Sequence, residues 1–462
     1  MREYYPLTAA QKMHHKWIMD YKTQQVSGVS VVVSLQVPLD FKILEKCIKL
    51  EYERYGCMRI RVTKPDKDGN SKQYIVKNDE REIPLMDLRY LGSIKAADDY
   101  LQKKAYETFD GDNIPLCDIS LIHLPEGYNG FFIHMDHRLI DSCGLVIMVE
   151  DIIKLYSHFR FGSEYPEDLA DFKTVLLKDL KKASNEKRFM KDKKFWDDQL
   201  DTLGEPLYSD IKGKSILEAA RKKHKKKSLR AADIEMDNLD VKVKDYYLEW
   251  EPTKNVLAFC MNHNLSMTNL LLLIMRTYLS KVNDNQKDIT IQNFISRRST
   301  HDEWTSGGSR TIMFPCRTVI EPDTDFLTAA YEIQNIQNRI YMHSNYDPDY
   351  IVEEMKKRYK TPEHTSYESC YLTYQPMPVK INSPHLDNFN VHAKWFANGA
   401  ATKKMYLTVS HTPDGGMCFS YHYQTACYDE HDMELLYYYM MRILFKGIAE
   451  PDMTIGEIIK EV

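Results

Sequence analysis

The sequence lacks the cysteine pairs and long apolar runs that mark several common classes of protein. Its nine cysteines are odd in number, and no two form a C-x-x-C pair, so a disulfide framework and a zinc site are both poorly supported. Scattered single cysteines are typical of a reducing compartment. No apolar run approaches the roughly 20 residues of a membrane span. The opening residues, MREYYPLTAAQ, place charged and aromatic side chains where a signal peptide has its apolar core. We therefore expect a cytoplasmic protein.

The chain also lacks an excess of one charge. Its 62 basic and 67 acidic residues give a net charge of −5, which supplies no general attraction to nucleic acid. One basic run, RKKHKKK at 221–227, is predicted to be a solvated loop in the polar stretch 211–233, with an acidic partner as the lesser interpretation. The 462 residues exceed the roughly 250–300 that one core supports, so two lobes are expected. We place the N-terminal lobe at 1–175 and the C-terminal lobe at 176–462.

Three familiar catalytic or binding motifs are missing. There is no G-x-G-x-x-G for a dinucleotide, no H-E-x-x-H for zinc and no G-x-S-x-G elbow for a hydrolase serine. Gly213-Lys214-Ser215 resembles the end of a P-loop, but Tyr208 stands where the first glycine of that loop is required. We expect no bound metal and no cofactor held by the chain.

Hydrophobic periodicity predicts a mixed α/β protein. Residues 29–37 alternate and are β-branched, which indicates a strand, and 119–136 are predicted to form a hairpin around Pro125-Glu126-Gly127. Residues 143–159 have a strong 3.6-residue period and are predicted to form a helix. The second half repeats this mixture of strands and helices, and PDGG (413–416) predicts a further hairpin turn.

The stretch FFIHMDHRLIDSCGLVIMVEDIIKLY (131–156) is the most informative part of the chain. An apolar strand stops at Asp136-His137, and an amphipathic helix begins near Cys143, with His137 and Asp141 at the change. Such a change from strand to helix places polar side chains at a sheet edge, where sites are commonly built. An H-x-x-x-D spacing is weak on its own, and a satisfied structural histidine is the simpler interpretation.

Several motifs that follow one another in a known order favour a functional interpretation of the 131–156 stretch. Together they resemble condensation domains of nonribosomal peptide synthetases. The 131–156 stretch is similar to the family signature HHxxxDG followed by a helix that ends in LY. The other similar segments, in chain order, are YPLTAAQ (5–11), RYGCMRIRV (54–62), FWDDQL (195–200), DITIQNFISRR (288–298) and GSRTIMFPCR (308–317). The family belongs to the superfamily of chloramphenicol acetyltransferase-like acyltransferases.

The resemblance implies two chloramphenicol acetyltransferase-like lobes in a V-shaped pseudo-dimer, with a tunnel between them. An acyl or aminoacyl thioester on phosphopantetheine, carried by a carrier protein or by CoA, would react there with an amine to form an amide. No carrier or adenylation domain is recognised in the 462 residues, so an acyl or peptidyl carrier protein is expected to act in trans. By the same resemblance, His137 is the catalytic histidine, and Asp141 pairs with Arg298 to hold the architecture of the site.

The chain departs from the family pattern at positions that would tune the site or line the tunnel. The departures are Asp136 in place of the first histidine, Ser142 in place of the motif glycine and Arg310 in place of a phenylalanine. The neighbouring Cys143 and Gly144 are further candidates for lining the tunnel or tuning the site. Strand alternation puts the side chain of Asp136 on the opposite face from that of His137. Three hypotheses stay open: an amide-forming acyltransferase, a degenerate module that binds carrier proteins, and an ester-forming relative. A nucleophilic Cys143 is the weakest interpretation.

Overall fold

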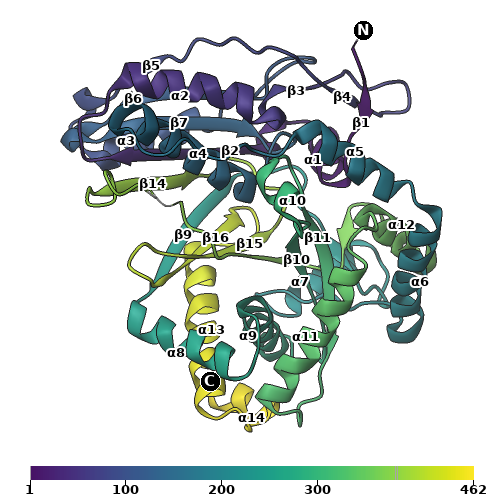
Figure 1. The fold of residues 1–462 in the computed structure, drawn as a ribbon. Helices are drawn as coiled ribbons and strands as arrows, with labels where there is room; N and C mark the ends of the chain where they lie inside the picture. Colours follow the sequence, from purple (N-terminus) through teal and green to yellow (C-terminus); the bar gives the residue numbers. More distant parts are fainter. Residues whose placement is uncertain (1, 380, 382) are drawn as a thin grey trace. The chain divides into compact units, whose positions relative to one another are not determined.

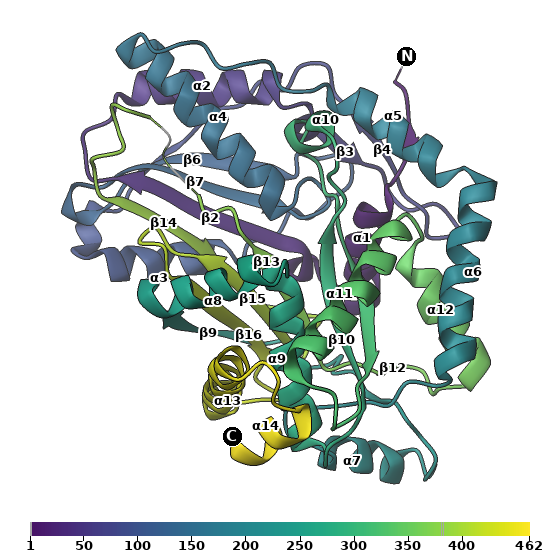
Figure 2. The same ribbon diagram turned by 60° about the horizontal axis from the view of Figure 1, so that its bottom comes forward.

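The computed structural model describes residues 2–379, 381 and 383–462, and it has the mixed α/β character predicted from the sequence (Figures 1 and 2). Backbone contacts divide the chain into two compact units, which are described separately. Unit 1 comprises Met1–Lys182, Ser296–Thr311 and Met377–Ala400. Unit 2 comprises Ala183–Ile295, Ile312–Pro376 and Ala401–Val462.

This division differs from the expected single boundary after residue 175, because two segments of the second half fold into unit 1. In the segment Met377–Ala400, strand β14 (Val391–Phe396) pairs antiparallel with β2 (Gly28–Leu35) along its whole length. In the segment Ser296–Thr311, helix α10 (His301–Thr305) contacts α4 (Ser142–Phe161), and the Gly307-Gly308 turn lies against Tyr55 and Phe172. Periodicity along the chain does not reveal such a crossing, since it depends on pairing between distant segments.

Unit 1 is built on a five-stranded sheet in the order β14-β2-β7-β6-β5. The remaining strands of this sheet are β7 (Asn129–Asp136), β6 (Cys117–His123) and β5 (Leu85–Asp87). The predicted hairpin is formed by β6 and β7, which pair antiparallel through the turn at Pro125–Gly127. A small sheet of β1 (Tyr5–Pro6), β4 (Lys72–Ile75) and β3 (Ile60–Val62) lies in the same unit.

Both faces of the unit 1 sheet are covered, which explains why β2 is apolar nearly throughout. Val31 and Val33 face one core cluster, which includes residues of α2 and α4, while Val32 faces a second cluster with residues of α3. Burial on both sides is the environment that a continuous β-branched run favours. The helices are α1 (Ala9–Tyr21), α2 (Phe41–Arg54), α3 (Ile94–Lys104), α4 (Ser142–Phe161) and α5 (Phe172–Ala183). Short 3₁₀ helices span Gln24–Ser27, Gly56–Arg59, Arg89–Leu91 and Pro125–Gly127.

Unit 2 is built on a six-stranded sheet in the order β11-β10-β13-β15-β16-β9. Its strands are β11 (Thr311–Val319), β10 (Asp288–Ser296), β13 (Cys370–Gln375), β15 (Met405–His411), β16 (Met417–Gln424) and β9 (Val241–Leu248), and β8 (Ala232–Asp233) pairs separately with β12 (Thr365–Ser366). The PDGG segment joins β15 to β16 as the predicted hairpin.

The helices of unit 2 include one core helix that explains the most apolar run of the sequence. They are α6 (Glu186–Leu203), α7 (Ser215–Lys223), α8 (Trp250–Asn262), α9 (Met267–Val282), α11 (Phe326–Met342), α12 (Pro348–Tyr359), α13 (Glu430–Ala449) and α14 (Ile455–Glu461). Helix α9 carries LLLLIM (270–275), and all six side chains are buried. Among the described residues no single helix could cross a membrane, although α8 and α9, bent by 108° at their junction, together meet the length and composition criteria for a span.

The basic run 221–227 is only partly the loop that was predicted. Helix α7 extends to Lys223, so the first three residues of the run form its last turn. Cations at a helix C-terminus interact favourably with its carbonyl ends, which accounts for a helix where the polarity of the run predicted a loop.

Candidate active site

His137 lies in the turn between β7 and α4 and is half-buried. Its backbone N–H donates to the carbonyl of Ser27 (2.6 Å), which ties the turn to the segment before β2. The helix begins immediately afterwards because Asp141 caps it, accepting from the backbone N–H of Gly144 (3.0 Å). The imidazole is thus carried by a short turn that is fixed at both ends.

The ring of His137 stacks on the ring of His14 in α1. The ring centroids are 4.6 Å apart and the planes differ by 9°, while Trp17 meets His14 edge-on at 4.9 Å. Helix α1 begins with a capping box between Thr8 and Gln11. Nε2 of Gln11 also donates to the carbonyl of Arg138 (3.1 Å), next to His137. The TAAQ segment therefore joins the start of α1 to the turn that carries His137.

Asp136, the residue that replaces the first histidine of the signature, is bound by Arg138 and Ser27. Its carboxylate accepts from Nε (3.0 Å) and Nη2 (2.8 Å) of Arg138 and from the hydroxyl of Ser27 (3.2 Å). It also accepts from the backbone N–H of Arg138 (2.7 Å), and its side chain is almost fully buried. The carboxylate is bound by the guanidinium of Arg138, and it is a structural part of the turn.

Asp141 and Arg298 form a buried, two-point ion pair within unit 1. Nη2 and Nη1 of Arg298 donate to the two carboxylate oxygens at 2.7 and 2.8 Å, and the side chains of Asp141 and Arg298 are 3% and 0% exposed. Asp141 also accepts from the backbone N–H groups of Arg310 and Thr311, both at 2.9 Å. Burial alone would raise the pKa of Asp141, but the charge of Arg298 and these hydrogen bonds hold it well below its usual range. The pair implied by the resemblance is therefore present.

Arg310 also lies beside Asp141, but it is the backbone of Arg310, and not its guanidinium, that binds the Asp141 carboxylate. Its guanidinium donates to the carboxylate of Asp179 at 2.6 and 3.1 Å and lies 3.5 Å from Glu303. The expectation that it lines a tunnel stays a prediction. Its backbone contact to Asp141 gives it a structural role in unit 1.

Gly144 and Ser142 occupy different environments at the start of α4. A Cβ on Gly144 would lie 2.7 Å from Cγ1 of Ile140 and 3.4 Å from Nη2 of Arg298, so no larger residue fits without movement. Ser142 is the first helical residue and does not have a positive φ, so the glycine of the family motif is not required there. Burial raises the pKa of Cys143, which disfavours the thiolate needed of a nucleophile.

The family assignment follows from the whole chain. A family model described as Condensation domain matches residues 1–460. The chain belongs to the condensation-domain family. A plipastatin synthase protein of Bacillus subtilis is 19% identical over 458 residues, which cover 98% of this chain and 17% of that protein. Surfactin synthase subunit 1 of the same species is 21% identical over 463 residues, which cover 98% of this chain and 12% of that protein. The chain thus spans less than a fifth of the length of either relative.

Solved structures support the fold of this condensation domain. The first condensation domain of the calcium-dependent antibiotic synthetase, in complex with a substrate analogue, has a TM-score of 0.78 at 15% identity, covering 99% of this chain and 98% of that one. The starter condensation domain of rhizomide synthetase in complex with C8-CoA has a TM-score of 0.79 at 14% identity, covering 98% of this chain and 96% of that one. The condensation enzyme VibH has a TM-score of 0.74 at 14% identity, covering 97% of this chain and 99% of that one. The predicted α/β fold with two lobes is confirmed.

Three residues of this condensation domain support the site and were not identified from the sequence. The hydroxyl of Tyr55 donates to the carbonyl of Gly144 (2.9 Å), and the carbonyl of Gly308 accepts from Nη2 of Arg298 (3.1 Å). A Cβ on Gly307 would lie 2.6 Å from Cζ of Tyr55. Tyr55 and Gly308 fall inside segments that resemble the family, but their roles depend on contacts between distant parts of the chain. Among the described residues, no group of three or more His, Cys, Asp or Glu could hold a metal ion.

Proposed function

We propose that this chain is a condensation-type acyltransferase that transfers an acyl or aminoacyl group from a pantetheine thioester to an amine, forming an amide. The observation that carries the proposal is the half-buried imidazole of His137 on a turn held by the Asp141–Arg298 pair, in a member of the condensation-domain family. The complex of a related domain with C8-CoA supports a thioester donor, and the complex of another with a substrate analogue and the condensation enzyme VibH support a catalytic role.

The chemistry requires a base or hydrogen-bond acceptor beside the attacking nitrogen. The nitrogen lone pair attacks the thioester carbonyl, the nitrogen loses a proton, and the C–S bond breaks to release the pantetheine thiol. An imidazole has an ordinary pKa of about 6.5, so a neutral ring is available near pH 7 to accept the proton or to hold the amine by a hydrogen bond. We assign this role to His137. The pH profile of kcat distinguishes a ring that accepts the proton from a ring that only holds the amine by a hydrogen bond.

The partners follow from the same chemistry. The donor is a thioester on an acyl or peptidyl carrier protein acting in trans, or on CoA, and the acceptor is a small-molecule amine in nonribosomal peptide or lipopeptide-like biosynthesis. The phosphopantetheine belongs to the donor, and the proposal needs no cofactor held by the chain. All nine cysteines are free thiols, which supports a reducing compartment and hence the cytoplasm.

The proposal is tested by intact-mass spectrometry of an acyl-loaded carrier protein incubated with the chain and a panel of amines. The expected result is loss of the acyl mass from the carrier and appearance of the amide, with both strongly slowed in the His137→Ala variant. Hydroxyl acceptors in the same panel detect an ester-forming relative. Binding of the loaded carrier without transfer to any acceptor would contradict the proposal and identify a degenerate binding module.

A further inference from the structure

Two basic segments from distant parts of the sequence lie side by side in unit 2. They are residues 221–230, at the end of α7 and in the loop after it, and residues 356–364, at the end of α12 and just beyond it. The strand pair β8–β12 joins the chain directly after each segment, and Nζ of Lys226 donates to the carbonyl of Lys360 (3.5 Å). The run that predicted a solvated loop is thus one half of a larger basic surface.

The positive charge of this surface is concentrated and largely unneutralised. Residues 221–230 contain seven lysines and arginines and no acidic residue, and 356–364 contain four and one glutamate, in a chain with a net charge of −5. Asp233 already pairs with Lys223, and Glu363 pairs with Lys356. Five exposed lysines form no ion pair with any residue that the structure describes, and we call them the lysine patch: Lys222, Lys225, Lys227, Lys357 and Lys360.

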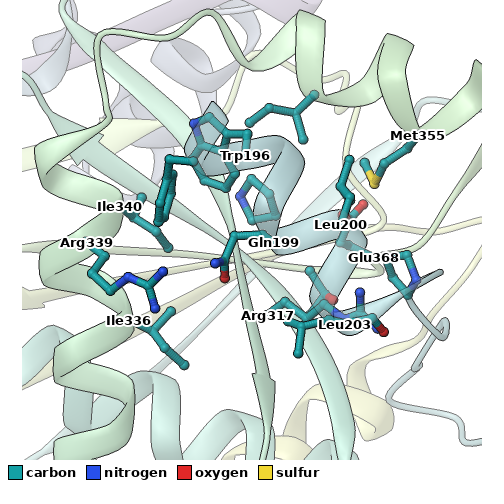
Figure 3. A pocket seen from close by; sticks show the side chains of 15 residues that line it. Trp196, Gln199, Leu200, Leu203, Arg317, Ile336, Arg339, Ile340, Met355 and Glu368 are labelled. Atoms are coloured by element: carbon teal, nitrogen blue, oxygen red, sulfur yellow. The ribbon is translucent and has the colours of Figure 1, made fainter. Parts of the chain in front are cut away.

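Both halves of the lysine patch are held by ordered contacts. Nε of Arg221 donates to the carbonyl of Leu229 (2.8 Å), which closes the loop after α7, and the side chain of Leu229 is buried. Figure 3 shows Met355 of α12 beside Leu200 of α6 in a mainly apolar pocket, which anchors the buried side of α12. A partner therefore does not have to order these backbone segments, and the entropic cost of docking is lowered.

Two features favour a protein partner over a nucleic acid. Carboxylates interrupt the positive charge at the α12 end: Asp201 and Glu363, whose side chains are 67% and 79% exposed, pair with Arg358 and Lys356. A phosphate chain that ran on past the patch would meet these carboxylates, whereas a compact acidic surface would not. Single-stranded nucleic acids also stack bases on aromatic rings, and Tyr359, the one tyrosine, phenylalanine or tryptophan of the two segments, donates its hydroxyl to a carbonyl of α6 (3.3 Å).

We infer that the lysine patch docks an acidic face of a protein partner. Ammonium groups at a surface stay hydrated and are screened by salt, so each contributes little to affinity, but together they accelerate the encounter with an opposite charge. The docking is therefore transient and sensitive to salt. It involves no residue assigned to acyl transfer, and its test does not depend on the proposed function.

The class of partner is tested by fluorescence anisotropy of labelled probes titrated with the full chain. The probes are a helical peptide of about 20 residues with about ten glutamates, the same peptide with glutamines, and a thymidylate oligonucleotide with about ten phosphates. The glutamate peptide is expected to bind at one site, at least about tenfold more tightly than the glutamine peptide, and to weaken at least about tenfold between roughly 50 and 300 mM salt. Equal affinity of the two peptides, or tighter binding of the oligonucleotide, would overturn the inference.

The location is tested by neutralising each half of the patch separately. Affinity for the glutamate peptide is expected to fall about tenfold when the three lysines of the α7 half are replaced and about threefold when the two of the α12 half are replaced, because both halves contact one partner. The variants are Lys222→Gln with Lys225→Gln and Lys227→Gln, and Lys357→Gln with Lys360→Gln. Wild-type affinity in either variant would overturn the inference that the two halves form one docking surface.

Three exposed lysines of unit 1, Lys42, Lys95 and Lys103, provide the matched control, since they also form no ion pair within the described part of the chain. Their combined replacement by glutamine removes the same charge as the α7 variant and should leave the affinity within about twofold. All three variants should keep the wild-type midpoint of urea unfolding, because exposed side chains without partners contribute little to stability. A loss in the control equal to that in the α7 variant would show attraction to net charge alone and would overturn the inference.

Discussion

The imidazole rings of His14 and His137 lie parallel, with centroids 4.6 Å apart and planes differing by 9°. One ring belongs to α1 and the other to the turn between β7 and α4, so the stack connects the opening segment of the chain to the candidate active site. This makes His14 a positioning residue for His137.

Replacement of His14 tests that role. In His14→Leu the stack is lost, and kcat for acyl transfer is expected to fall about two- to tenfold with KM for the thioester little changed, because aromatic pairs contribute about 0.5–1.5 kcal/mol. His14→Phe retains a ring that can stack on His137 and should recover most of kcat. His15→Phe on the same helix is the control. Equal losses in the leucine and phenylalanine variants would show that stacking does not position His137.

The Asp141–Arg298 pair is expected to contribute to stability as a unit. Asp141→Asn leaves a buried guanidinium without its counter-charge, and the free energy of unfolding should fall by about 3–5 kcal/mol. Adding Arg298→Met should restore part of that loss, giving a positive coupling in a double-mutant cycle measured by urea unfolding. Because the pKa of Asp141 is lowered in the folded state, the difference from wild type should stay constant from pH 8 to pH 5 and shrink only below about pH 4. Additive losses would contradict a coupled pair.

Glu51 predicts a pH dependence of the opposite sign. It is fully buried in α2, where burial and then the charge of Asp151 raise its pKa well above the usual range, while Arg54 is bound to Asp151 at 2.8 and 3.2 Å. Above the ordinary glutamate pKa of about 4.3, the folded state keeps a proton that the unfolded state releases, so stability falls by up to about 1.4 kcal/mol per pH unit. Glu51→Gln removes this slope and should be more stable than wild type at pH 8.

Partly exposed Glu45, which pairs with Lys49 on the same helix, provides the matched control for Glu51. Glu45→Gln should leave the pH dependence of thermal unfolding as in wild type. Parallel curves for wild type and Glu51→Gln from pH 5 to pH 8 would show that Glu51 is ionised in the folded protein.

Substitution of Gly144 should be far more costly than substitution of Ser142. Gly144→Ala places a methyl group 2.7 Å from Cγ1 of Ile140 and close to Arg298, and an overpacked site of this kind costs about 1–3 kcal/mol. Transfer activity should fall with it, because the helix start moves relative to His137. Ser142→Gly should lower the midpoint of thermal unfolding only slightly and leave activity near wild type. Higher activity in Ser142→Gly would show that serine at this position impairs the site.

Much of the site could be predicted from local sequence because its residues lie in ordered motifs. Asp141 and Arg298 were found by matching two short segments, and the hairpin before His137 by its alternation. The H-x-x-x-D spacing alone was not sufficient, since it recurs at His343 and Asp347 in unit 2. There the ring of His343 stacks on Phe195 at 4.2 Å and its Nδ1 lies 2.8 Å from Asp192, so it is part of the packing between helices.

What could not be predicted depends on contacts between distant segments. The stack of His14 on His137 and the pairing of β14 with β2 each join parts of the chain with no shared periodicity. The partner of Asp136, Arg138, could not be predicted, because the turn bends the chain back within two residues. Local patterns specify elements, and only the folded chain specifies which side chains meet.

The central claim, that the imidazole of His137 carries out acyl transfer, is tested most directly by initial rates of amide formation from one acyl-loaded carrier protein and one accepted amine. Wild type, His137→Ala and the uncatalysed background are compared at equal concentrations, with circular dichroism to establish that the variant is folded. We predict a loss of at least about a hundredfold in His137→Ala, within the 10²–10⁴-fold contribution of a positioned acid–base group. Equal rates for wild type and the folded variant would contradict the account.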